Sequence, residues 1–413
     1  MIQIDDVSDR SYAFPTIDFK FHNPGGTSAV LWQFAIEVLE AKLDLTPVLT
    51  FAFDVDHFPG IDRAVGGPGE LIWLAPVRRW TSGVTRPDCW RCTLADAHPL
   101  PRFLPRRELG RTGFRVTSVG IGDLADRSIP LEQCVATLHR AMDAGLNLVD
   151  TAPGYEDGYS EEIVGEALRG RRDGMFVIDK IDFLDQPVTP QVETSLGRLK
   201  LDAVDLFVFH NVSELAIWQK LAAPGGGMAE LGRCIQAGKA RFRGISSHHP
   251  DVLRAALETG LCDVVMFPVG PFCHPRYVEE ILPLARAKEV GTVCFKTFGA
   301  GKLLGDTEGY GRPLQSRPRG KVSSGGHEAP TPSLPHLSVE ECVRYTLTVD
   351  PDVALLGMSF TNEQDAALTA AAAFRALTPE QLADVRRRAS LAIEGKGKVW
   401  WDPVETPRPA ANG

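Results

Sequence analysis

LNLVDTAPGY, residues 146–155, decides the fold of this chain: it is an apolar run of strand length that ends in Asp150, with Tyr155 five residues further on. Two later stretches repeat the pattern: MFVIDK, which ends in Lys180, and DLFVFH, which ends in His210. Helical patterns separate the three runs. Strands that alternate with helices favour a parallel sheet, whose carboxyl ends carry the functional groups. We therefore expect all four polar side chains at one rim.

Strands and helices are predicted to alternate along the chain after a predicted hairpin, RELGRTGFRV (107–116). Strands are predicted up to Gly122 and at 146–150, 175–180, 204–209, 241–245, 263–267, 292–296 and 353–357. Helices are predicted at 131–143, 160–169, 190–199, 228–237, 250–259, 277–288, 338–348, 363–373 and 379–394. Runs such as VVMF, TVCF and VALL are apolar throughout, as in parallel strands buried on both faces. The pattern fits a (β/α)8 TIM barrel better than a doubly wound open sheet.

The chain divides by composition into a barrel and its flanking segments. Residues 1–75 mix strand-like runs such as VLTFAFDV and ELIWLAP with one helical pattern, and are expected to form an extension or small accessory segment. A Pro-, Arg- and Trp-rich linker follows, and a loop rich in Gly, Pro and Ser interrupts the barrel after its seventh strand. The remaining predicted ranges are the linker 76–106, the barrel 107–403, the loop 306–337 and the tail 404–413.

Composition narrows the class of protein. The 413 residues are 44% hydrophobic with a net charge of −9, which argues against a nucleic-acid partner. The one short basic run, Arg386 to Arg388, follows a predicted N-cap at Thr378 and a first helical residue at Pro379, so it is expected on the solvated face of a helix.

Neither a metal site nor a membrane segment is expected. Cys89 and Cys92 form the only C-x-x-C among eight cysteines, without the second pair that a zinc site needs. His248 and His249 are adjacent, and adjacent side chains seldom reach one ion. The longest early apolar stretch, 29–41, is too short and too acidic to span a bilayer. A cytoplasmic protein is expected, while its oligomeric state stays open.

The four strand-end residues suit proton transfer. A phenol has a pKa near 10, and a nearby ammonium favours the phenolate, so Lys180 is expected to lower the pKa of Tyr155. Asp150 would hold Lys180 charged, and His210 would share the proton or orient a substrate oxygen. A tyrosine tuned in this way is a general acid for a carbonyl oxygen or a base for an alcohol. The set lacks an electron source, which a cofactor must supply.

These residues resemble the aldo-keto reductase family. NLVDTAPGYEDGYSEEIVGEAL is similar to its motif around the catalytic aspartate and tyrosine, FVIDK to its lysine strand and DLFVFHN to its histidine strand. The resemblance implies an NAD(P)H-dependent carbonyl reductase whose substrate is a small carbonyl or alcohol. Tyr155 would be the proton donor, Lys180 would lower its pKa, Asp150 would hold Lys180, and His210 would orient the carbonyl.

The resemblance also implies a cofactor site along the later strand ends. GKARFRGISS (238–247) is similar to the fifth strand of the family, whose end contacts the nicotinamide carboxamide. GAGKLLG (299–305) has glycines and a lysine suited to a pyrophosphate. The predicted contacts are Gly122, Ser246, Ser247, Met266, Lys296, Thr297, Gly299, Gly301, Lys302, Gly357, Met358, Ser359 and Asn362.

Three departures from the family pattern affect the cofactor side. Met266 stands where many members have Gln, Lys296 where many have a stacking Tyr, and Glu156 where Gly is common. No Lys or Arg occurs in GMSFTNEQD (357–365), although a 2′-phosphate favours a basic partner. NADP(H) and NAD(H) both remain possible. A nucleotide-binding regulatory or structural subunit with little turnover is the alternative function.

Overall fold

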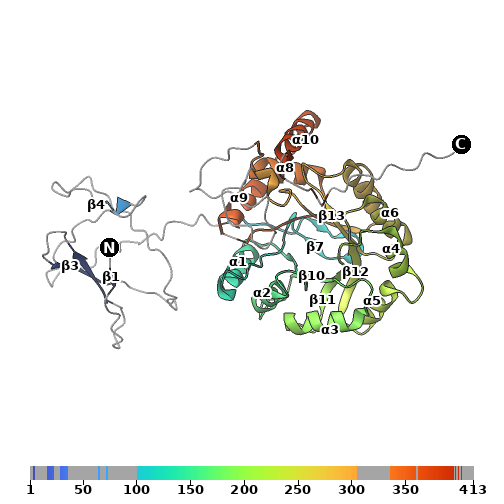
Figure 1. Cartoon of the computed structure of the whole chain (residues 1–413), viewed down its shortest axis with the longest axis horizontal. Helices are drawn as coiled ribbons and strands as arrows, with labels where there is room; N and C mark the ends of the chain where they lie inside the picture. The colour runs from blue at the N-terminus through green and yellow to red at the C-terminus, as the bar shows by residue number, and fades with distance from the viewer. Residues whose placement is uncertain are drawn as a thin grey trace. The chain divides into compact units, whose positions relative to one another are not determined.

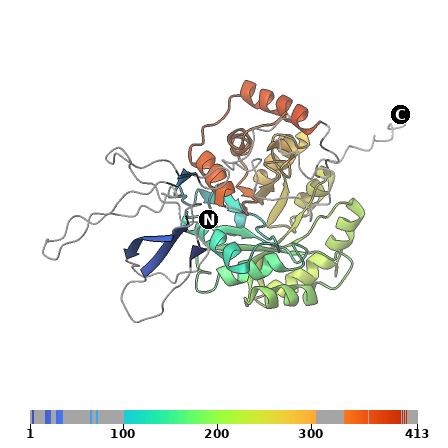
Figure 2. The same ribbon diagram turned by 60° about the vertical axis from the view of Figure 1, so that its left-hand side comes forward.

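The computed structural model describes residues 100–304, 335–359 and 361–394, the single residues 396, 399 and 401, and the backbone of five short strands before residue 100. The chain separates into two compact units, Met1–Pro99 and Leu100–Gly413. The second unit contains the barrel and is shown from two sides in Figures 1 and 2.

The predicted TIM barrel is confirmed. Parallel strands close in the order β10-β11-β12-β13-β14-β15-β8-β9. Their bounds are β8 (Val119–Ile121), β9 (Leu148–Asp150), β10 (Phe176–Ile181), β11 (Val204–Phe209), β12 (Ala240–Ser246), β13 (Val264–Pro268), β14 (Gly291–Phe295) and β15 (Val353–Leu356). Closure leaves no unpaired strand edge, which removes a route to aggregation.

Helices surround the strands (Figure 1). Their bounds are α1 (Leu131–Asp143), α2 (Tyr159–Ala167), α3 (Val188–Leu199), α4 (Leu215–Ala222), α5 (Gly227–Gln236), α6 (Pro250–Thr259), α7 (Leu282–Ala287), α8 (Val339–Val349), α9 (Thr361–Ala372) and α10 (Pro379–Ile393). Thr378 caps α10 and Pro379 is its first residue, as predicted. Sequence patterns missed α4, and the predicted helix 277–288 begins as a π-helical segment, Tyr277–Ile281, before α7.

Strand alternation divides the core into two layers. Leu148, Ile178 and Val208 belong to the cluster that fills the barrel interior, whereas neighbours such as Val177 and Phe207 pack outward against the helices. Since side chains alternate along a strand, residues two positions after an interior residue also face inward. This alternation turns the polar residues at the strand ends toward the barrel axis, beyond the apolar interior layer.

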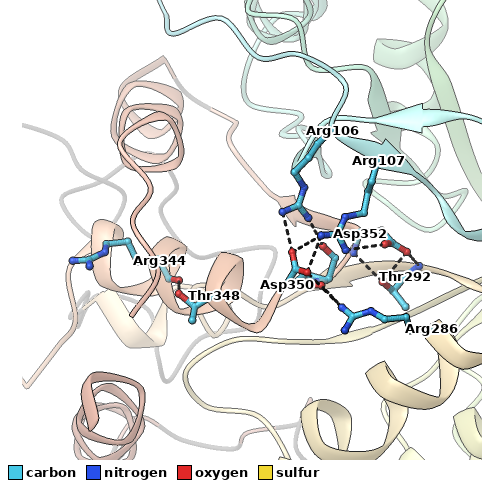
Figure 3. Close-up of polar contacts among 9 residues, drawn as sticks. Arg106, Arg107, Arg286, Thr292, Arg344, Thr348, Asp350 and Asp352 are labelled. Atoms are coloured by element: carbon cyan, nitrogen blue, oxygen red, sulfur yellow. Dashed lines mark hydrogen bonds and ion pairs between the residues drawn. The ribbon is translucent and has the colours of Figure 1, made fainter. Parts of the chain in front are cut away.

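The predicted hairpin is confirmed as β6 (Arg107–Glu108) and β7 (Arg115–Val116), which pair antiparallel. It is tied to the start of β15 by ion pairs (Figure 3). Arg107 donates to both oxygens of Asp350, at 2.6 and 2.7 Å, and Arg106 lies 2.9 Å from the same carboxylate. Asp352 accepts from the backbone N–H of Thr292 on β14 at 2.9 Å. These contacts join the hairpin to the amino ends of the last two strands.

Arg107→Ala is expected to lower the free energy of unfolding by about 1 kcal/mol, because a charge-assisted pair is lost at a half-exposed position. Burial raises the pKa of Asp350, but the two arginines outweigh it and hold the pKa below its usual value. The stabilisation is present above that usual value and is lost as pH falls through the lower pKa of the folded protein. Urea unfolding at neutral and acidic pH measures both effects. Arg169→Ala, which removes a more exposed pair with Glu166, is the matched control. An equal effect of both substitutions would contradict the assigned role.

The unit Met1–Pro99 contains short antiparallel strands in the part of the chain described. They are β1 (Gln3–Ile4), β2 (Thr16–His22), β3 (Ser28–Ala35), β4 (Ala64–Val65) and β5 (Leu71–Ile72), paired β1-β2-β3 and β4-β5. No helix is described before residue 100, and the helical pattern within 1–75 stays a prediction because most of these residues lie outside the described ones. The run VLTFAFDV, most of the linker 76–106, most of the loop 306–337 and the tail 404–413 lie outside the described residues.

The end of the predicted linker contacts the barrel, since Phe103 donates its backbone N–H to Ala144 O at 2.7 Å. The described helices include none that is long and apolar enough to cross a membrane.

Candidate functional site

Three of the four predicted catalytic residues lie at the carboxyl ends of adjacent strands. Asp150 ends β9, Lys180 lies near the end of β10, and His210 directly follows β11. Each stands two positions after a residue of the interior cluster, so alternation turns all three toward the barrel axis. The β9–β10 register pairs Ile178 with Asp150. Lys180 therefore lies two residues further along β10 than the partner of the aspartate.

Lys180 and Asp150 form a buried ion pair. The ammonium Nζ lies 2.7 Å from both carboxylate oxygens of Asp150 and 2.7 Å from the carbonyl oxygen of Thr151. Both side chains are almost completely buried. Burial would lower the pKa of Lys180, but Asp150 and Tyr155 raise it above its usual value. Lys180 is therefore charged, as predicted for the residue that Asp150 holds.

Tyr155 lies in the loop between β9 and α2, next to Lys180 and His210. The Lys180 Nζ is 4.5 Å from the centroid of the phenol ring, and the His210 ring meets it edge-on at 5.7 Å between centroids. Glu156, where the family commonly has Gly, has a left-handed φ of 50°. A non-glycine residue adopts this backbone at a cost. Arg127 holds the loop by donating to Glu156 O at 2.9 Å.

The net shift in the pKa of Tyr155 is opposite to the sequence prediction. Burial raises this pKa above its usual value, and Lys180 lowers it by less. Sequence reasoning counted the ammonium but not the desolvation of the phenolate. Tyr155 is thus protonated at neutral pH, as an ordinary phenol also is. The Lys180 ammonium beside its ring is placed to stabilise negative charge on the phenol oxygen.

Asp182 is a site residue that sequence reasoning missed. Its Oδ1 lies 2.6 Å from Nδ1 of His210. Burial raises the pKa of Asp182, but His210 and the nearby backbone of Gly154 outweigh it and hold the pKa below its usual value. A side chain at Gly154 would place its Cβ 2.6 Å from Asp182 Oδ2, so the close approach requires glycine. Asp182 thus links the tyrosine loop to the histidine. The sequence signal that could have identified Asp182 is its position two residues after Lys180, which predicts the same inward face.

Ser246 and Ser247 lie at the end of β12 and bond to the β11 loop. Ser246 Oγ accepts from the N–H of Asn211 at 2.8 Å, and Ser247 Oγ donates to Val212 O at 2.7 Å. Met266 on β13 packs in the barrel interior. Gly122 follows β8 and donates its N–H to Leu356 O at 2.7 Å. Gly122, Ser246 and Ser247 therefore lie at or just beyond the ends of their strands, whereas Met266 lies within β13.

The predicted contacts after β14 differ in exposure. Thr297 is 1% exposed, and its Oγ1 has no hydrogen-bond partner within the described part of the chain. Gly299 and Gly301 both have left-handed backbone. Lys302 is buried, with Nζ 5.9 Å from the ring of Trp401. Its side chain therefore packs beside Trp401.

The end of β15 borders a small cavity lined by Phe298, Leu304, Val339, Gly357, Met358 and Glu363. Ser359 follows these residues and is half-buried; the side chain of Asn362 is outside the described part of the structure. Arg140 of α1 reaches the start of α9, where it donates to Thr361 O at 3.1 Å and pairs with Asp365 at 2.5 Å. The segment 357–365 contains no Lys or Arg that could bind a 2′-phosphate. Arg140 lies beside this segment, but its guanidinium is already paired with the carboxylate of Asp365.

Comparison with known proteins decides the family. The model of the "Aldo/keto reductase family" matches residues 118–388, a span that includes all eight barrel strands and all four predicted catalytic residues. The chain belongs to the aldo-keto reductase family.

Individual relatives of this aldo-keto reductase are distant. It is 29% identical to L-galactose dehydrogenase of Arabidopsis thaliana, over 48% of this chain and 66% of that protein. It is 27% identical to the NADH-specific methylglyoxal reductase of Escherichia coli, again over 48% and 66%. The match thus spans slightly less than two thirds of these relatives. An aldo-keto reductase of Klebsiella pneumoniae in complex with NADPH shares the fold, with a TM-score of 0.52 and 19% identity over 69% of this chain and 95% of that one.

The rim of this aldo-keto reductase fits a nicotinamide nucleotide. The buried hydroxyl of Thr297 offers a donor that no other described residue uses. A small cavity adjoins Thr297 at Phe298 and Gly357. Described residues elsewhere provide no group of three or more His, Cys, Asp or Glu side chains suited to a metal ion. Cys89 and Cys92 lie outside the described residues.

Asp182→Asn is expected to lower kcat/KM by about tenfold or more, a typical loss when a partner that orients a functional histidine is removed. The amide cannot accept from Nδ1 of His210 as strongly as the carboxylate does, so the histidine loses its anchor. Steady-state kinetics on the variant measure the effect. Asp185→Asn, in the same loop, is the control. Wild-type kinetics in the Asp182 variant would show that His210 does not depend on it.

Proposed function

We propose that this protein is an NAD(P)H-dependent carbonyl reductase in which Tyr155 donates the proton. The observation that carries the proposal is the position of one buried ammonium, Lys180, between the carboxylate of Asp150 and the phenol of Tyr155. The cofactor, when bound, supplies a hydride to the carbonyl carbon. Thr297 and the residues at the end of β15 would hold it.

The chain's own residues handle the proton. Tyr155 gives its hydroxyl proton to the carbonyl oxygen, and the charge left on its oxygen is stabilised by Lys180. Asp150 keeps Lys180 in place and charged. Because Nδ1 of His210 is engaged by Asp182, Nε2 is the ring nitrogen available to orient the substrate oxygen. In the reverse direction the Tyr155 phenolate accepts the proton of an alcohol.

Neither cofactor is selected by the described residues. A relative is named for its NADH specificity, and a structural neighbour binds NADPH. The segment 357–365 has no Lys or Arg, and Arg140 is paired with Asp365. Dissociation constants for NADH and NADPH, measured by fluorescence, would establish the preference.

A turnover assay tests the proposed function directly. Purified protein should bind NADH or NADPH and oxidise it in the presence of aldehydes, ketones or sugar-like carbonyls. Absence of both binding and turnover over a broad panel would refute the reductase function. Binding without turnover would favour a nucleotide-binding regulatory subunit, which the complete set of strand-end residues argues against.

Composition supports two finer proposals. With a net charge of −9, the protein is proposed to act on small molecules and not on nucleic acid. Its proposed location is the cytoplasm, which fractionation would test.

A further inference from the structure

A pair of buried carboxyl groups lies on the outer side of β10, the strand that carries Lys180. Val177 packs outward against the helices while Ile178 belongs to the interior cluster, so alternation also turns Asp179 outward. Asp179 is completely buried there, as is Glu161 of α2. The two side chains are neighbours, since the charge of Glu161 acts on Asp179. The proposed proton transfer uses neither of them.

One oxygen of each carboxyl group has a donor, and the other has none. Oδ1 of Asp179 accepts from the backbone N–H of Lys180 at 2.7 Å. Oε2 of Glu161 accepts from the guanidinium of Arg198 on α3 at 2.8 Å. Oδ2 of Asp179 and Oε1 of Glu161 are buried and accept from no residue that the structure describes. Buried acceptors without a donor are unfavourable, and a proton on one carboxyl group would supply the missing donor.

The charges around the pair leave one carboxylate uncompensated. Arg198 is the cation that acts on Glu161, and Lys180 is the cation that acts on Asp179. Asp150 already compensates Lys180 through two contacts of 2.7 Å, and it raises the pKa of Asp179. Two carboxyl groups are therefore left with one guanidinium. A buried charge without a partner is unfavourable and is removed when the group binds a proton.

Neutral groups adjoin the pair from the other elements. The residue opposite Asp179 on β11 is Phe207, and Ser195 of α3 presents a buried hydroxyl to Glu161. Burial raises the pKa of Glu161, and burial together with the charge of Glu161 raises the pKa of Asp179 well above its usual value. These surroundings favour one protonated and one ionised carboxyl group.

We propose that Glu161 and Asp179 share one proton at neutral pH, and that this protonated pair joins α2 to β10. Lys180 is the next residue of β10, and α2 begins at Tyr159, four residues after Tyr155. Loss of the proton would bring two negative charges together in the core and weaken the contact between the two elements. The pair is thus a pH-sensitive contact between the strand of Lys180 and the helix that follows Tyr155.

The sign of the pH dependence follows from the unfolded chain. There both carboxyl groups are in water and ionise near pH 4, so the folded protein holds one proton more than the unfolded chain between that pH and the raised pKa of the pair. The stability that the shared proton contributes is complete below about pH 4 and is lost as pH rises through the raised pKa. Unfolding at neutral pH therefore releases the proton.

Asp179→Asn and Glu161→Gln test the shared proton. Each amide supplies the missing donor and leaves one carboxyl group for the single guanidinium. Protons released on urea unfolding in weakly buffered solution at neutral pH are counted with a pH indicator, and each variant should release about one proton fewer than wild type. Infrared spectra of the folded proteins in D2O keep the test valid if one variant does not fold. Wild type should show the C=O band of a protonated carboxyl group, and a folded variant should lack it.

Asp205→Asn is the matched control. Asp205 is also buried, on the neighbouring strand β11, but it pairs with both Arg172 and Arg241, at 2.6 and 2.9 Å. Because this carboxylate has its own cations, the substitution should leave the number of released protons unchanged.

Hydrogen exchange followed by mass spectrometry tests the contact between α2 and β10. One proton released on opening lowers protection about tenfold for each unit of rising pH. Above pH 4, the protection factors of these two elements should therefore fall about tenfold more per pH unit in wild type than in Asp179→Asn. None of these measurements involves turnover, so they stand independently of the proposed reductase function.

Three results would overturn the proposal. The first is equal proton release from wild type and both variants, and the second is a wild-type spectrum without the protonated carboxyl band. The third is a stability that rises with added NaCl or KCl in wild type alone, with equal proton release, which would assign the carboxyl groups to a bound cation. A variant that releases one proton fewer but keeps the wild-type pH dependence of exchange would refute the role of the pair in joining α2 to β10.

Discussion

Tyr155→Phe is expected to lower kcat for carbonyl reduction by about 10²- to 10⁴-fold, the usual contribution of a general acid. The variant loses only the hydroxyl, and that group acts when the substrate oxygen becomes negative. Affinity for NADH or NADPH should remain close to wild type, since the lost interaction belongs to the transition state. Stopped-flow measurement of a single turnover, together with cofactor fluorescence, would record both quantities.

Tyr159→Phe is the matched control for this prediction. The same hydroxyl is removed four residues away, where it donates to Ile129 O at 2.8 Å and serves the packing of α2. Its kcat should stay near wild type. Turnover retained in the Tyr155 variant, or lost equally in both variants, would show that the proton comes from another group.

Lys180→Met should have the largest effect on stability. It leaves the Asp150 carboxylate buried without its cation, and breaking a buried pair in this way costs about 3–5 kcal/mol. The rate of reduction should also fall, because the developing charge on Tyr155 loses its stabilising ammonium. Urea unfolding followed by circular dichroism, with kinetics at low denaturant, measures the two effects separately.

The double variant Asp150→Leu with Lys180→Met separates stability from function. Replacing both charges with apolar groups removes the unpaired carboxylate, so most of the lost stability should return. Activity should not return, since Tyr155 still lacks its neighbouring charge. If the double variant is as unstable as Lys180→Met, the ion pair must stabilise the barrel by more than the neutralisation of its two buried charges.

The strand-end residues were predictable because their signal is local. Asp150, Lys180 and His210 each end an apolar run. Because side chains alternate along a strand, each of the three lies on the same face as the interior residue two positions before it. The hairpin at 107–116 and the N-cap at Thr378 were read in the same way, from short patterns whose geometry depends on a few consecutive residues.

Asp182 shows where such reasoning stopped. Its position two residues after Lys180 predicts the inward face, but its partner His210 comes from another part of the chain. Only the folded barrel brings the two side chains within hydrogen-bond distance. Lys302 is a similar case, because the ring of Trp401, almost a hundred residues later, covers it.

The sequence by itself determined the barrel and its inward-facing strand ends, with the residues proposed for proton transfer, because alternation and apolar periodicity act between near neighbours. Tertiary structure decided the state of those residues. Burial outweighs Lys180 and raises the pKa of Tyr155 above its usual value. Desolvation and charge proximity depend on segments far apart in the chain, so they exist only once the barrel has closed.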